Sequence, residues 1–234
     1  MKGKIYMQQT QLVRKAFTLA ETLVVVGIIG IIATLTLPNV NKSTGDKEKV
    51  VKLKKTYSNL EQAFGMAKIK YGTGYTNWFK NSSSKNPVAE RIFEYMKISK
   101  TCGYNNNAGC FAKNSNLDGS DFVAYKVITT DGTSIYIDCF AACYAYVDID
   151  GPNKGESTVG KDIFCFGIDD NKGIVPYGGG YQNYTDADCI KKKDISCTSW
   201  VINYGNLDYL KTGTDGKCPD KKTILDGNKI TSCK

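Results

Sequence analysis

The sequence contains no histidine. This absence excludes Ser-His-Asp and Cys-His catalysis and every metal site that uses imidazole. It also removes the most common general base, so an enzyme would have to rely on carboxylate, lysine or cysteine chemistry. No spacing of those residues indicates such a site, and we predict that the chain is not an enzyme.

No cysteine lies before residue 100, and none of the nine forms a C-x-x-C pair. Zinc sites are usually built from such pairs, so disulfides in an oxidising compartment are the better interpretation. The sequence does not fix the pairing, but loop length favours three bridges: Cys102–Cys110, Cys189–Cys197 and Cys218–Cys233. The remaining three, Cys139, Cys143 and Cys165, would share one bridge and leave one thiol, either buried or free to cross-link subunits.

Residues 1–16 contain no acidic side chain and four basic ones, which supply half of the formal net charge of +8. The rest of the chain has 27 basic and 23 acidic residues. This excess is too small to argue for nucleic-acid binding, and no nucleic-acid partner is predicted.

An apolar run at residues 17–37 holds a single charge, Glu21. About 20 such residues cross the hydrocarbon core as a helix, and the basic flank predicts a cytoplasmic N-terminus. A secretory signal peptide would have a shorter apolar core and a small-x-small cleavage site after it, which is missing here. A carboxylate in a membrane segment costs roughly 2.5–3.5 kcal/mol on insertion scales, so Glu21 either has a partner or reaches the interface.

Beyond Pro38, apolar residues recur at spacings of three and four, which predicts an amphipathic helix with one apolar stripe. The stripe consists of Val50, Leu53, Tyr57, Leu60, Phe64, Ala67 and Tyr71. The charged residues of this segment mostly lie off the stripe. Gly72 and Gly74 are expected to end the helix. The stripe favours docking onto the protein's own domain over a coiled-coil seam.

After Gly74 the pattern changes to short strands and turns. Strands are predicted at residues 122–128, 134–138, 144–149 and 163–168. The Asp131-Gly132 pair between the first two is a strong hairpin signal. A short helix is expected at about 89–97, and residues 198–204 are either a last strand or a helical turn.

The segment R-K-A-F-T-L-A-E-T-L and its continuation to Pro38, residues 14–38, resembles the N-terminus of type IV pilins and type II secretion pseudopilins. In that family a prepilin peptidase removes a basic leader before a Phe, the new N-terminus is methylated, the fifth mature residue is Glu, and a Pro kinks the helix. The resemblance implies cleavage between Ala16 and Phe17, with Glu21 and Pro38 in register. The family usually has Gly before the cut, and Ala16 keeps a small residue there.

The same resemblance implies where the protein acts and with what. Glu21 of one subunit would meet the Phe17 amine of its neighbour in a filament. The partners would be prepilin peptidase, other pilin or pseudopilin subunits, and an inner-membrane assembly platform. The protein would sit in the bacterial inner membrane as a single pass with its head outside the cytoplasm, then enter a filament in the periplasm or at the cell surface.

A second resemblance to pseudopilin-like heads involves D-I-D-G-P-N at residues 148–153 and G-K-D-I-F at 160–164. No cofactor is predicted, except that the oxygen side chains of Asp148, Asp150 and Asn153 are candidates for calcium. The full EF-hand pattern is absent, and the same residues are ordinary turn formers.

The sequence therefore predicts an α+β protein with a long kinked N-terminal helix, half transmembrane and half amphipathic, packed on a small antiparallel sheet with a disulfide-rich C-terminal region. The expected boundaries are a cleaved leader at 1–16, a transmembrane or filament-core helix at 17–38, an amphipathic helix at 39–72 and a globular head at 73–234. The predicted function is that of a filament subunit of a pilus or pseudopilus. The alternative is a single-pass anchored, extracytoplasmic binding domain that does not polymerise.

Overall fold

A computed structural model describes residues 19–72, 74–80, 82–104, 109–111, 124–152 and 157–233, without the side chains at 21, 30 and 32–44. The chain divides into two compact units, residues 1–44 and 45–234. The predicted leader, including Ala16 and Phe17, lies outside the described residues.

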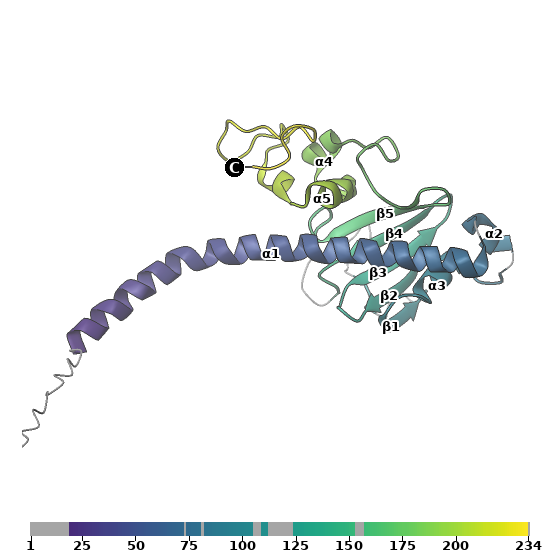
Figure 1. Ribbon diagram of the computed structural model, residues 1–234, viewed down its shortest axis with the longest axis horizontal. Helices are drawn as coiled ribbons and strands as arrows, with labels where there is room; N and C mark the ends of the chain where they lie inside the picture. Colours follow the sequence, from purple (N-terminus) through teal and green to yellow (C-terminus); the bar gives the residue numbers. More distant parts are fainter. Residues whose placement is uncertain are drawn as a thin grey trace, which may run out of the picture. The chain divides into compact units, whose positions relative to one another are not determined.

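Helix α1 extends from Leu19 to Tyr71 (Figure 1). Pro38 is a helical residue within it. The helix therefore covers the predicted membrane segment, from its third residue on, and the predicted amphipathic segment. It ends at Tyr71 because Gly72 adopts a left-handed conformation, with φ of +85°, as expected for a helix-terminating glycine. The bend expected at Pro38 stays a prediction, since the Pro38 side chain is not described.

Within residues 19–31 the apolar side chains are exposed. Each of eight is more than half exposed: Leu19, Leu23, Val24, Val25, Val26, Ile28, Ile29 and Ile31. In the described part of the chain, no helix combines the length and the apolar character needed to cross a membrane. The last six residues of the predicted span, 32–37, fall among the side chains that are not described.

In the second unit, α1 packs on a sheet through the predicted stripe, which confirms docking onto the protein's own domain. Five residues of the stripe are buried: Val50, Leu53, Leu60, Phe64 and Ala67. The other two, Tyr57 and Tyr71, are partly buried against the same core. Phe164 and Phe166 face them from the sheet, both fully buried. A spacing of three and four keeps these residues on one side of the helix, so the helix turns a single face to the sheet.

The sheet is an antiparallel meander of six strands in sequence order. The strands are β1 (Ile98–Gly103), β2 (Tyr125–Thr129), β3 (Ser134–Cys139), β4 (Cys143–Asp148), β5 (Ile163–Asp169) and β6 (Gly173–Pro176). The four predicted strands correspond to β2–β5, and Asp131-Gly132 lies in the β2–β3 hairpin turn. The edge strands β1 and β6 were not predicted.

Short helices flank the sheet: α2 (Tyr75–Lys80), α3 (Pro87–Phe93), α4 (Asp186–Lys192) and α5 (Thr198–Tyr204). The prediction of a helix at 89–97 was wrong at both ends. Asn86 caps α3 by accepting from the Ala89 amide at 3.0 Å, and this cap sets an earlier start. Residues 198–204 form a helix, one of the two predicted possibilities.

Four disulfides link the cysteines of the described head. Three join the pairs favoured by loop length, and the fourth joins Cys139 to Cys143 across the β3–β4 turn. Cys165 is unpaired and fully buried in β5. The C-terminal region beyond Pro176 is therefore stapled by two bridges, Cys189–Cys197 and Cys218–Cys233.

Candidate functional site

Two regions carry the residues singled out in the sequence. The first is the N-terminal motif. Glu21 lies in helix α1, but its side chain is not described, and Ala16 and Phe17 lie outside the described residues. The motif therefore remains a sequence-based prediction, with the exposed apolar helix at residues 19–31 as its described surroundings.

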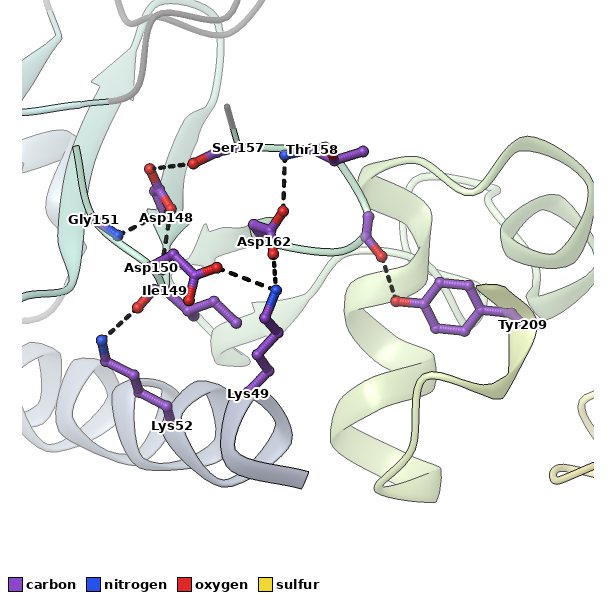
Figure 2. Close-up of polar contacts among 11 residues, drawn as sticks. Lys49, Lys52, Asp148, Ile149, Asp150, Gly151, Ser157, Thr158, Asp162 and Tyr209 are labelled. Carbon is purple, nitrogen blue, oxygen red and sulfur yellow. Dashed lines mark hydrogen bonds and ion pairs between the residues drawn. The ribbon is translucent and has the colours of Figure 1, made fainter. Parts of the chain in front are cut away.

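The second region is the turn after β4, where the Asp148 carboxylate accepts hydrogen bonds from other residues of the turn (Figure 2). Its carboxylate accepts from the amides of Asp150 and Gly151, each at 3.2 Å, and from Ser157 Oγ at 3.0 Å. The residue is fully buried. Burial raises the pKa of this carboxyl, and the three hydrogen bonds only partly oppose that effect.

Lys49 of α1 reaches the same region and lies between two carboxylates (Figure 2). Its Nζ is 3.1 Å from Asp150 Oδ2 and also pairs with Asp162 Oδ1. Asp162 is nearly buried and accepts from the Thr158 amide at 3.0 Å. Burial lowers the pKa of Lys49, but hydrogen bonds to Asp162 and Asp150 outweigh burial and leave it raised.

Lys49 is the first of three lysines spaced three residues apart on α1, which we call the lysine row: Lys49, Lys52 and Lys55. Lys52 donates to the Ile149 carbonyl oxygen, and Lys55 pairs with Asp131 at 2.9 Å. The row thus ties one side of α1 to the turn after β4 and to the β2–β3 turn. Lys49 and Lys52 lie off the apolar stripe, as expected, but they are partly buried because they bridge α1 to other segments of the head.

The contacts of Asp148 and Asp150 are relevant to the calcium prediction. The described Asp148 contacts are backbone amides and a hydroxyl, and Asp150 faces an ammonium group. Across the described ranges, no group of three or more metal-binding side chains occurs. Asn153 lies outside them. Lys49 therefore already places one positive charge between Asp150 and Asp162, and a calcium ion bound to those carboxylate oxygens would have to displace it.

The contacts of two residues in this region, Asp162 and Tyr209, were not anticipated from the sequence. Asp162 is more deeply buried than Asp150, the other carboxylate that pairs with Lys49. Tyr209, in the C-terminal region, donates its hydroxyl to the Gly160 carbonyl oxygen at 2.5 Å (Figure 2). The spacing of the lysines was visible in the sequence, but their partners lie about a hundred residues away. Only the fold brings α1, the turn after β4 and the C-terminal region together.

Comparison with known proteins finds no matching family model, no similar curated protein and no similar solved structure.

Proposed function

We propose that the chain is a structural subunit of a type IV pilus-like or type II secretion pseudopilus filament, anchored in the membrane before assembly. The observation that carries this proposal is Glu21, the only charge in residues 17–37, placed five positions into the segment that starts at Phe17. Apolar character explains a membrane anchor, but it does not explain a carboxylate at that offset.

The described part of the N-terminal helix supports an assembly role. Apolar side chains of residues 19–31 are exposed around the helix, and a helix that is apolar on all sides needs lipid or other helices to cover it. Membrane lipid would provide that cover before assembly, and helices of other subunits would provide it in a filament. The same α1 continues to Tyr71, so one element serves both anchor and head.

Packing in the head supports a mechanical link between the helix and the head. The buried stripe and the lysine row attach α1 to the sheet along most of residues 49–71. A subunit pulled from the membrane by its helix would therefore carry its head with it. The four disulfides add resistance to unfolding outside the cytoplasm.

Glu21 would act through charge pairing. Removal of residues 1–16 leaves an α-amine on Phe17, and methylation preserves its positive charge. When this amine pairs with the Glu21 carboxylate of a neighbouring subunit, neither charge is left unpaired among the apolar helices. The pair also fixes the axial register of the two subunits.

The test compares the wild type with Glu21→Val and with Glu21→Asp, which keeps the charge. Mass spectrometry of the mature N-terminus should find a methylated Phe17 in all three. Sheared filaments should contain the wild type, contain less of Glu21→Asp and lack Glu21→Val, which stays in the membrane fraction. Normal incorporation of Glu21→Val would refute the pairing. An intact residue 1–16 segment in the membrane form would favour the anchored binding domain instead.

A further inference from the structure

Five tyrosine rings form a continuous row on the head. Tyr144 lies between Tyr146 and Tyr177, with ring centroids 6.5 and 6.0 Å away. Tyr177 in turn contacts two rings of the turn that follows β6, Tyr181 at 6.0 Å and Tyr184 at 5.1 Å. All five residues are partly exposed. We call these five residues the tyrosine row.

The row lies on the face of the sheet that is turned away from α1. Side chains alternate between the two faces along a strand, and Ala145 and Val147 of β4 belong to the core beneath α1. Tyr144 and Tyr146 therefore point to the opposite face. At one end of the row, Tyr146 stacks on the buried Tyr136 of β3, with centroids 4.7 Å apart and planes inclined by 17°. The row is thus built on the central strands of the sheet.

Gly167 of β5 makes room for one of these rings. A Cβ at this position would overlap the ring of Tyr181. Gly167 pairs with Tyr144 across β4 and β5, so the Tyr181 ring lies directly on the sheet beside the row's strand residues. A glycine weakens a strand interior, and the close approach of this ring explains it here. The sequence therefore gives up strand stability to seat Tyr181 in the row.

The turn that carries Tyr181 and Tyr184 holds two residues in a costly backbone conformation. Gln182 and Asn183 both have positive φ, of 55° and 65°. Residues other than glycine seldom adopt this region, and such outliers concentrate at binding and active sites. Both side chains are exposed. Their amide groups therefore stand beside the rings as hydrogen-bond donors and acceptors.

The composition of the row fits one class of ligand. Each ring offers an apolar face with partial negative charge and a hydroxyl that forms hydrogen bonds. A sugar ring has the complementary surface, with weakly positive C–H groups on its face and hydroxyl groups around its edge. Tyrosine also loses little conformational entropy on binding. Small molecules bind in concave pockets, so an open row of rings suits a chain of sugars better than a single one.

The charges around the row argue against a polyanion such as nucleic acid. Two carboxylates, Asp138 of β3 and Asp169 of β5, belong to the same face by the alternation of their strands. Lys192 lies over the last ring of the row, 4.8 Å from its centroid, but it also pairs with Asp188 at 3.0 Å. Nucleic acids bind where several cations are available to their phosphates. The expected ligand is therefore an uncharged chain.

We propose that the tyrosine row binds a neutral polysaccharide. Rings of the row stack on successive sugar units, and Gln182 and Asn183 hydrogen-bond to the sugar hydroxyl groups. This binding activity belongs to the head alone and does not depend on the proposed filament role.

The direct test is affinity electrophoresis of the full chain in non-denaturing gels with a neutral detergent. The gels contain hydroxyethyl cellulose, dextran or galactomannan, or no polysaccharide. We expect at least one of the three to retard the chain relative to a non-binding reference protein, and added sodium chloride should not reverse the effect. Unchanged mobility in all three gels would overturn the proposal. Tighter binding to single-stranded oligothymidylate, abolished by salt, would overturn it in favour of a nucleic-acid surface.

Variants test whether the rings themselves make the contact. Tyr177→Ala removes the ring that joins the strand and turn parts of the row and should weaken binding about tenfold, whereas Tyr177→Phe keeps the ring and should bind within about twofold of the wild type. The matched control, Phe140→Ala, removes a ring that is 94% exposed and lies outside the row, and it should bind as the wild type does.

Thermal melting followed by circular dichroism establishes that each variant is folded. If Tyr177→Ala does not melt cooperatively, Tyr184→Ala takes its place, because it deletes a ring from the turn and leaves the strands intact. A folded ring-deleting variant that binds polysaccharide as tightly as the wild type would contradict the proposal.

Discussion

Tyr57 of α1 stacks on Phe166 of β5, with ring centroids 5.4 Å apart and planes inclined by only 10°. Phe166 is fully buried, while Tyr57 is partly exposed and donates its hydroxyl to Glu61 at 2.9 Å. Burial of the Tyr57 phenol, together with Glu61, raises its pKa to about 12, so the ring stays neutral at ordinary pH. The stack lies in the middle of the stripe and joins the helix to β5, the strand next to the edge strand β6.

Replacing the buried partner of this stack should weaken the head strongly. Phe166→Ala removes a fully buried ring and leaves a cavity under α1, and we expect a loss of about 3–5 kcal/mol in the free energy of unfolding. Tyr57→Phe is the matched control, because it keeps the stacked ring and removes only the hydroxyl. Urea unfolding followed by circular dichroism measures both. A loss below about 1 kcal/mol for Phe166→Ala would mean that α1 does not pack here.

The stripe shows what the sequence could predict and why. A spacing of three and four identifies the buried face of α1, because the helix repeat alone decides which side chains share a side. The four central strands were predicted from apolar, β-branched and aromatic runs. Three of the four disulfide pairs followed from short loops, the partner of Cys139 having been left open, and Asp131-Gly132 located a hairpin turn.

Other elements could not be predicted with the same reasoning. The exposed strand β1 has a polar sequence, I-S-K-T-C-G, and gains its conformation by pairing with β2. The strand β6 has four residues, too few for an alternating pattern. Helix α4 does have a local signal in the sequence, the capping box of Thr185 and Asp188, although no helix is predicted there. The partners of the lysine row depend on tertiary structure, and no local pattern identifies Asp162.

Loss of the Lys49 ammonium should leave an uncompensated carboxylate on Asp162, whose side chain is only 4% exposed. We expect Lys49→Met to cost about 3 kcal/mol in unfolding free energy, and the double variant with Asp162→Asn to recover part of it. Lys55→Met is the matched control in the same row, where the lysine side chain is 58% exposed and the loss should stay within about 1 kcal/mol. Equal losses for the two single variants would show that burial of the pair does not matter.

The Asp131 carboxyl should make the head sensitive to acid. Burial raises its pKa, but hydrogen bonds from Thr129 and Lys55 outweigh that effect and hold the pKa below the usual 3.8. The unfolded chain then binds the proton more readily, so this contribution is present above about pH 3.8 and is lost as the pH falls toward the folded pKa. Melting temperatures measured between about pH 6 and 2 should fall less steeply for Asp131→Asn than for the wild type. Parallel curves would contradict this role.

Chelation tests whether the turn after β4 holds calcium. Because Lys49 already pairs with Asp150 and Asp162, we expect the melting temperature to be the same with a calcium chelator and with added calcium. Magnesium serves as a control for general ionic effects. A rise with calcium alone, lost in Asp150→Asn, would show that the ion displaces the lysine and that Asp150 is a ligand.

Cys165 provides a test of the whole disulfide arrangement. It is fully buried in β5, and burial raises the pKa of its thiol well above the ordinary value, so the thiolate that reacts with alkylating agents is scarce. We expect no labelling of the native protein by iodoacetamide, and one labelled thiol per chain after denaturation without reductant. Peptide mapping should locate that label at Cys165 and recover the four bonded pairs intact. A Cys165→Ser variant should take up no label under either condition. A label at Cys139 or Cys143 would mean that the β3–β4 bridge is absent.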